Sequence, residues 1–167
     1  MSADAQGRSD VTPVAWGERL AGVYRGIGAR AMRELPIYHH ALDVEAIGFS
    51  VVEGRILGIV VTPWFMNLVT PAAQGSAGSV VKIVLPAGSF EFTIGDIAGI
   101  GRIASCSLFS PMFEFADMAA ARAAAEAALA ALMAAPEDEA LSERAAKASS
   151  TIDRRAFLRG TLSEGRA

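Results

Sequence analysis

Cys106, His39 and His40 are the residues in this sequence best suited to act as a nucleophile, a base or a soft metal ligand. A lone cysteine that works with a distant histidine is one known arrangement for nucleophilic catalysis. Here the two histidines are adjacent, far upstream and in a predicted loop, and nothing in the local sequence ties either of them to Cys106. The pattern favours a small packed thiol over a catalytic one.

Patterns for metal binding, phosphate binding and acid–base catalysis are equally weak. Adjacent histidines in an extended segment point to different sides, and the sequence contains no C-x-x-C or H-x-x-E. The glycines of Gly95–Gly101 lack the spacing of a phosphate-binding loop. A pair of catalytic carboxylates must converge in a cleft, and sequence spacing alone does not establish that convergence. The candidate acids on predicted strands and turns are Asp43, Glu45, Glu53, Glu91 and Asp96. We predict no enzymatic activity, no metal site and no cofactor.

Two segments stand out because they crowd large apolar side chains together. TPWFMNLV (Thr62–Val69) follows a predicted strand, and CSLFSPMFEFAD (Cys106–Asp117) surrounds a predicted helix start. A strand with one buried face should alternate between apolar and polar residues, and these segments do not. They form either a core buried on both sides or an adaptable apolar surface that receives a segment of another protein. The candidate contacts for such a partner are Trp64, Phe65, Met66, Phe109, Met112 and Phe113, with Asn67 and Ser110 as polar anchors.

Composition limits the classes of protein that fit these segments. The chain has 167 residues, of which 52% are hydrophobic and 20% are charged, so it is long and apolar enough for one folded domain. A net charge of −3 argues against a nucleic-acid-binding protein. A single cysteine fits a reducing compartment, and polar Met1–Asp10 has no apolar signal-peptide core. The apolar run Ile56–Met66 is shorter than the roughly 20 residues that span a bilayer. We expect a cytoplasmic protein without membrane insertion.

The elements that must position these residues read as helix, strands, helix. Thr12-Pro13 predicts a helix start, and an apolar stripe with three- and four-residue steps runs from there to an end at Pro36. Alternation and turn signals then predict strands, which lie over residues 44–52, 55–61, 64–69, 80–85, 89–94 and 102–109. This order predicts an α+β fold with an antiparallel meander flanked by an N-terminal and a C-terminal helix.

The second helix is predicted to begin at Ser110-Pro111 and to end before Pro136. Arg122 lies within its apolar stripe, and we expect it to pair with Glu126 one turn later. The predicted organisation is a flexible lead over residues 1–11, a single α+β domain over residues 12–135, and a charged helical or disordered tail over residues 136–167.

Four stretches of the chain resemble the HybE/HupJ-type accessory proteins of [NiFe]-hydrogenase assembly. They are VEAIGF (44–49), GRILGIVVTPWFMNLV (54–69), LPAGSFEF (85–92) and CSLFSPMFEFADMAAARAAAEAAL (106–129). The resemblance runs in order from about Leu35 to Leu132 and includes both of the crowded apolar segments. The chain departs from the expected pattern in the small residues of Thr70–Ser79 and in Tyr38-His39-His40.

The resemblance implies a cytoplasmic chaperone without enzymatic activity for a membrane-bound uptake [NiFe]-hydrogenase. It implies partners among the hydrogenase subunit precursors, especially the twin-arginine-bearing small subunit before export, and among other accessory proteins. Nickel insertion belongs to other proteins of the pathway. The alternatives are a metal or iron–sulfur delivery protein that acts through Cys106, and a scaffold that binds no client.

The C-terminal segment contains a motif similar to the export signal of such clients. Arg154 and Arg155, one further residue, and then Phe157 and Leu158 repeat the twin-arginine order. No apolar stretch follows, so the motif does not act as an export signal here. It is either a basic, solvated tail or a tethered copy of the client motif that occupies the client groove.

Overall fold

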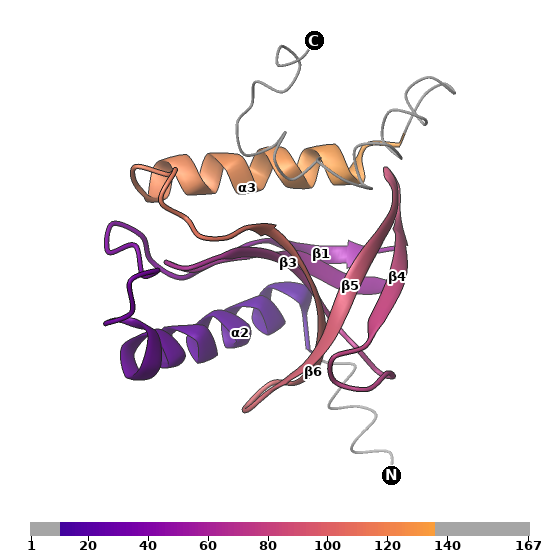
Figure 1. Ribbon diagram of the computed structural model, residues 1–167. Coiled ribbons are helices and arrows are strands. Elements are labelled where there is room, and N and C mark those ends of the chain that lie inside the picture. The colour runs from indigo at the N-terminus through magenta and orange to yellow at the C-terminus, as the bar shows by residue number, and fades with distance from the viewer. Residues whose placement is uncertain (1–10, 136–167) are drawn as a thin grey trace.

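The computed structural model describes residues 11–135 as a sheet packed between two helices. Helix α2 (Pro13–Ile27) lies on one face of the sheet and helix α3 (Met118–Met133) on the other (Figure 1). The predicted lead, apart from Val11, and the predicted tail lie outside the described residues. Among residues 11–135, no helix has the length and apolar character that a membrane-crossing helix needs.

The sheet has six strands, and every neighbouring pair in it is antiparallel. The strands are β1 (Glu45–Val52), β2 (Arg55–Val61), β3 (Met66–Pro71), β4 (Val80–Leu85), β5 (Gly88–Ile97) and β6 (Gly101–Phe109). Their order is β1-β2-β3-β6-β5-β4, so two three-stranded meanders meet where β3 pairs with β6. The predicted α+β class, with an antiparallel sheet and a helix at each end of the domain, is confirmed.

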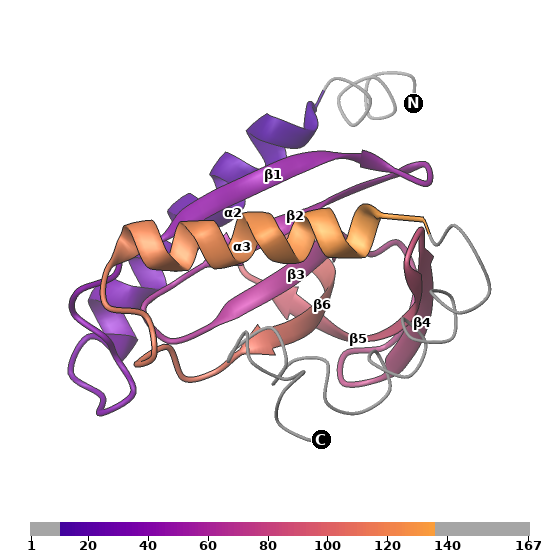
Figure 2. The same cartoon turned by 90° about the horizontal axis from the view of Figure 1, so that it is seen from above.

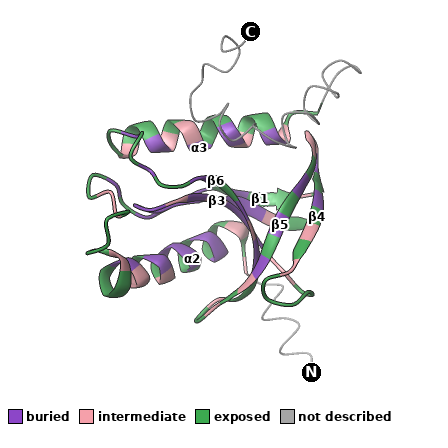
Figure 3. Cartoon of the chain, viewed as in Figure 1, coloured by how far each residue is buried: buried purple, intermediate pink, exposed green. Residues whose placement is uncertain are grey.

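The sheet separates two hydrophobic clusters. One fills the space under α3 and takes in most of the apolar residues of β2–β6, and the other lies under α2. Trp64, Phe65 and Val69 belong with the α2 side, whereas Met66 and Leu68 belong with the α3 side. The crowding of large residues in TPWFMNLV therefore reflects burial on both faces of β3. Figure 3 shows the buried side of each helix turned toward the sheet.

The first helix begins as predicted and ends earlier. The Thr12 side chain accepts a hydrogen bond from the Ala15 amide at 3.0 Å, and Pro13 occupies the first turn. Helix α2 stops at Ile27 and continues as a π-helical turn, η1 (Gly28–Met32), so the expected end at Pro36 is wrong. Gly28 packs against the Trp64 ring, and a Cβ added at Gly28 would lie 3.2 Å from a carbon of that ring.

The second helix begins seven residues later than predicted. Its N-cap is Asp117, whose carboxylate accepts a hydrogen bond from the Ala120 amide at 2.9 Å. Ser110 and Pro111 are joined by a cis peptide bond in the loop before it. This loop buries Met112 and Phe115 in the core under α3, and tertiary packing of these side chains takes precedence over the local helix-start signal.

The loop after α2 and the loop before α3 lie at the same end of the molecule. Both views place residues 33–44 and 110–117 there, and the hairpin of β4 and β5 lies at the opposite end (Figure 1, Figure 2). The segment between β2 and β3 also reaches this end. We call this region the loop end.

Candidate partner-binding site

The predicted contact residues divide into a buried and an accessible group. Met66, Phe109 and Met112 are buried in the cluster under α3, and Trp64 is buried under α2. Phe65 is partly buried, whereas Phe113 is 53% exposed. Most of the apolar crowding therefore builds the core, and of the six apolar candidates Phe65 and Phe113 keep accessible surface.

His39 holds the loop end together. Its Nε2 lies 2.7 Å from the Phe115 carbonyl oxygen, and its backbone amide donates to the Pro63 carbonyl at 3.0 Å. Its ring packs on Phe113 with the centroids 5.3 Å apart. One residue, through its side chain and its backbone amide, thus joins three loops that are distant in the sequence. The sequence predicts a loop at His39 and contains no signal for this role.

Three large apolar side chains are exposed on the loops that His39 connects. Leu35 and Ile37 are 44% and 40% exposed on the loop that carries His39, and Phe113, on which the His39 ring packs, is 53% exposed. We call these three residues the loop-end patch. Exposed apolar side chains that gather on neighbouring loops are typical of interaction surfaces, whereas single ones are ordinary.

Four aromatic rings pack together next to the loop that carries Leu35 and Ile37. Tyr38 stacks on Trp64 with ring centroids 6.0 Å apart, and Trp64 in turn meets Phe65 edge-on at 5.6 Å. Tyr24 of α2 packs edge-on against Phe65 at 5.3 Å, and burial raises the pKa of the Tyr24 phenol. Rings packed in this way have few alternative conformations, so they provide a rigid base for the loops above them.

The two predicted polar anchors are Ser110, in the loop before α3, and Asn67, on β3. Ser110 Oγ donates a long hydrogen bond of 3.5 Å to the Trp64 carbonyl oxygen. Asn67 Oδ1 is buried and has no hydrogen-bond partner among the described residues. A buried acceptor without a partner is unusual in a native structure, so Asn67 has an unused capacity to accept a hydrogen bond.

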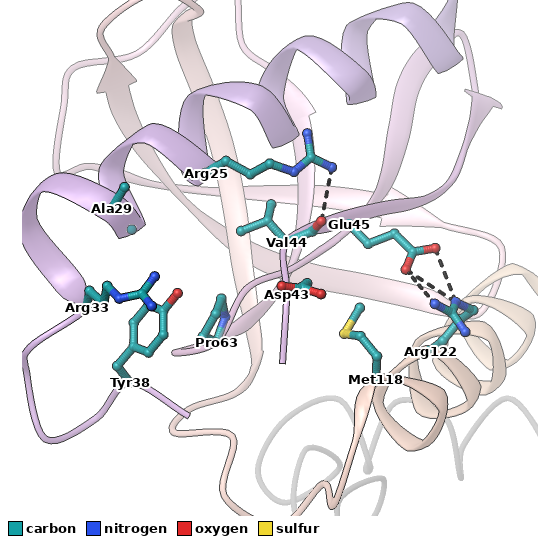
Figure 4. Close-up of a pocket in the computed structure, with 11 residues that line it drawn as sticks. Arg25, Ala29, Arg33, Tyr38, Asp43, Val44, Glu45, Pro63, Met118 and Arg122 are labelled. Atoms are coloured by element: carbon teal, nitrogen blue, oxygen red, sulfur yellow. Dashed lines mark hydrogen bonds and ion pairs between the residues drawn. The ribbon is translucent and has the colours of Figure 1, made fainter. Parts of the chain in front are cut away.

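A charged pocket of about 410 Å³ opens beside the rings (Figure 4). Arg25 and Arg33 come from α2 and the turn after it, Asp43 and Glu45 from the start of β1, and Arg122 from α3. The remaining wall is made of Gly28, Ala29, Tyr38, Val44, Pro63 and Met118. No local motif in the sequence indicates this pocket, because Arg25 and Arg122 are 97 residues apart on different helices.

The ion pair predicted for Arg122 is wrong. Arg122 reaches across to Glu45, with Nη2 2.8 Å from Oε1 and Nε 3.1 Å from Oε2, and it forms no ion pair with Glu126. The hydrogen bond and the charge of Glu45 raise the pKa of Arg122, and the more distant charge of Glu126 adds a smaller increment. The spacing of one helical turn would allow a pair with Glu126. Glu45 is preferred because both oxygens of its carboxylate accept hydrogen bonds from the Arg122 guanidinium.

Cys106 lies on β6 and is buried in the cluster under α3. Among residues 11–135, no three histidine, cysteine, aspartate or glutamate side chains come together in a way that would hold a metal ion. The twin-arginine-like segment with Arg154, Arg155, Phe157 and Leu158 lies outside the described residues.

Comparison with known proteins gives a consistent result. The family described as "[NiFe]-hydrogenase assembly, chaperone, HybE" matches residues 15–160. The hydrogenase expression/formation protein HupJ of Bradyrhizobium diazoefficiens is 61% identical over 160 residues, 94% of this chain and 95% of that protein. The corresponding protein HoxT of Azotobacter vinelandii is 40% identical, over 87% of this chain and 95% of its own.

A solved structure has the same fold. The solution structure of HybE from Escherichia coli superposes with a TM-score of 0.60 and covers 75% of this chain and 80% of that one. The two sequences are 23% identical over this match, so the likeness concerns the fold.

Proposed function

We propose a client-binding role for the loop end, starting from the fact that this chain belongs to the HybE family of [NiFe]-hydrogenase assembly chaperones. The family consists of chaperones and not of enzymes, and its partners are hydrogenase subunits. The proposed client is the precursor of the small subunit of a membrane-bound uptake hydrogenase, held in the cytoplasm before export. The observation that carries the proposal is the loop-end patch, which exposes three large apolar side chains on loops joined by His39.

The charges beside the patch support a basic and apolar client segment. Glu34 precedes Leu35 and Glu114 follows Phe113, and both carboxylates are exposed. A twin-arginine signal carries two cations next to apolar residues. Its arginines would form ion pairs with these carboxylates. Its apolar residues would cover Phe113, and each Å² of apolar surface buried there would stabilise the complex by roughly 25 cal/mol.

The accessible members of the predicted contact set complete the proposed surface. Phe65 is partly buried and Ser110 is exposed. The Oδ1 atom of Asn67 is buried, so Asn67 would act together with the buried members. The buried members Trp64, Met66, Phe109 and Met112 would act through the shape of the surface that they support.

A substitution at Phe113 tests this proposal. Phe113→Ser should preserve thermal stability, because the side chain is half-exposed, and it should reduce capture of the small-subunit precursor at least tenfold in a pull-down with purified proteins. Val84→Ser is the matched control, since Val84 is 66% exposed on the edge strand β4, away from the loop end. Each subunit precursor is offered with and without its signal peptide.

Three results would contradict the proposal. Full capture by Phe113→Ser would remove the patch from the binding surface. Equal capture of the precursor without its signal peptide would remove the signal as the recognised segment. Preference for the large-subunit precursor would replace the proposed client.

A further inference from the structure

We propose that the charged pocket beside the loop-end patch binds a carboxylate side chain of the client protein, next to the segment that covers Phe113. This inference rests on the proposed function, which supplies the client protein as the partner. The residues that line the pocket supply the argument for a carboxylate ligand. The pocket is a separate subsite with the opposite charge preference to the carboxylates Glu34 and Glu114 beside the patch.

The internal pairing of charges determines what the pocket attracts. Glu45 and Arg122 neutralise each other through a two-pronged contact of 2.8 and 3.1 Å. Arg25 uses one donor on the Val44 carbonyl oxygen at 3.1 Å. The side chain of Arg33 has no hydrogen bond or ion pair with any residue in 11–135. The two cations of Arg25 and Arg33 and the one carboxylate of Asp43 remain, so the lining carries one net positive charge.

The lining suits a carboxylate that is carried on an aliphatic stem. Arginine presents planar, parallel N–H donors that fit the two oxygens of a carboxylate. Arg25 of α2 and Arg33, which follows η1, both line the pocket (Figure 4). Val44, Pro63 and Met118 provide an apolar wall for the methylene groups of a glutamate side chain. A free phosphate has no aliphatic stem to cover this apolar wall, so the wall favours a glutamate side chain.

Position argues for a residue of a protein client and not for a small free anion. Tyr38 lines the pocket and stacks on Trp64, and His39, the next residue, packs on Phe113. A single extended peptide that lies on Phe113 would pass close to the pocket mouth. The volume of about 410 Å³ accommodates one or two side chains.

The test uses three short probes and the full chain labelled with ¹⁵N. The probes are acetyl-Leu-Glu-amide, acetyl-Leu-Gln-amide and acetyl-Leu-Arg-amide, titrated at low ionic strength while the Arg Nε–H and backbone signals are followed by NMR. The glutamate peptide should bind with a dissociation constant on the order of a millimolar and shift the signals of Arg25 and Arg33. The glutamine peptide should bind roughly tenfold more weakly, because it loses the charge-assisted hydrogen bonds.

Variants distinguish binding from damage to the fold. Arg33→Ala should weaken binding of the glutamate peptide about tenfold, whereas Arg30→Ala, an exposed neighbour in η1 that does not line the pocket, should leave it unchanged. Asp43→Asn should strengthen binding, because it removes the repelling carboxylate. An increase in affinity is an outcome that structural damage does not produce.

Opposite results would overturn the proposal. These are preference for the arginine peptide, equal affinity for all three peptides, saturation by inorganic phosphate at lower concentration than by the glutamate peptide, or unchanged binding by Arg33→Ala. The client pull-down separates the two proposals: intact capture by Arg33→Ala would remove the subsite and leave the loop-end surface standing. Peptide binding at the pocket without capture of a precursor by the unmodified chain would contradict the proposed function alone.

Discussion

Two glycines leave room for the ring of Phe49 between α2 and the sheet. Its ring lies between Gly17 of α2 and Gly58 of β2, and a Cβ added at either position would overlap with it. Trp16 then packs edge-on against the same ring with centroids 5.7 Å apart. A glycine inside a helix usually lowers helix stability by about 1 kcal/mol relative to alanine. At Gly17 the missing side chain allows an aromatic ring to pack closely against the helix backbone.

Gly17→Ala should destabilise the protein by about 1–3 kcal/mol, because the added methyl group would lie 2.5 Å from a Phe49 ring carbon in a filled core. Gly22→Ala on the same helix is the control. No atom lies within 4 Å of the new Cβ there, and we expect a gain of up to about 1 kcal/mol. Urea unfolding measures both changes, and a stabilised Gly17→Ala would contradict the packing described for Phe49.

Cys106 is buried on β6, which fits the prediction of a structural thiol. Cys106→Ala should lower the free energy of unfolding by about 1 kcal/mol through the small cavity that it leaves, and it should retain capture of the client and maturation of the hydrogenase. A folded Cys106→Ala variant that fails to support maturation would favour the delivery of a metal or an iron–sulfur group through this thiol.

At the scale of elements, α3 is held to the sheet by small side chains and one ion pair. Ala121, Ala125 and Ala128 are buried, so the helix backbone approaches the sheet closely. Leu129 packs next to Gly48, whose positive φ of 67° accompanies an irregularity in the β1–β2 register. The pair between Glu45 and Arg122 lies at the pocket end of the same helix and sets its position relative to β1.

A double-mutant cycle tests that element contact. Glu45→Gln and Arg122→Gln, alone and together, should show a small favourable coupling that shrinks as salt is added, since both side chains are partly exposed. The cycle of Arg122 with Glu126 should show a much smaller coupling. The reverse order of the two couplings would support the pair within the helix instead.

At the scale of the whole molecule, both helices leave the loop end open to a partner. The sheet is covered by α2 under β1 and β2 and by α3 on the other face, and neither helix covers Leu35, Ile37 or Phe113. The C-terminal segment with Arg154 and Arg155 is long enough in sequence to act as a tethered competitor for this surface.

A chain that ends at Ser150 should bind a synthetic twin-arginine signal peptide more tightly than the full chain. A tethered copy of the motif reaches an effective concentration of about a millimolar, so removing it should free a weak site. Arg154→Ala combined with Arg155→Ala should have the same effect as the truncation. Fluorescence anisotropy at physiological salt measures all three forms, and equal affinities would make the segment a solvated tail.

Local chemistry in the sequence determined the elements. All six strands, the Thr12 cap and the α+β class were predictable, because alternation, turn residues and capping side chains act over a few neighbouring positions. The family could also be identified from long, unusual segments that remain contiguous in the chain. The end of α2 and the start of α3 were predicted wrongly, because packing of Gly28 on Trp64 and burial of Met112 and Phe115 outweigh local signals.

Only the tertiary structure decided which apolar residues are core and which are surface. Met66 and Phe113 look alike in sequence, yet one is fully buried under α3 and the other is half-exposed on a loop. The clamp at His39 and the pocket between Arg25, Arg33 and Arg122 join segments that are tens of residues apart. Their contacts depend on how the sheet and the helices pack, and no local pattern encodes that arrangement.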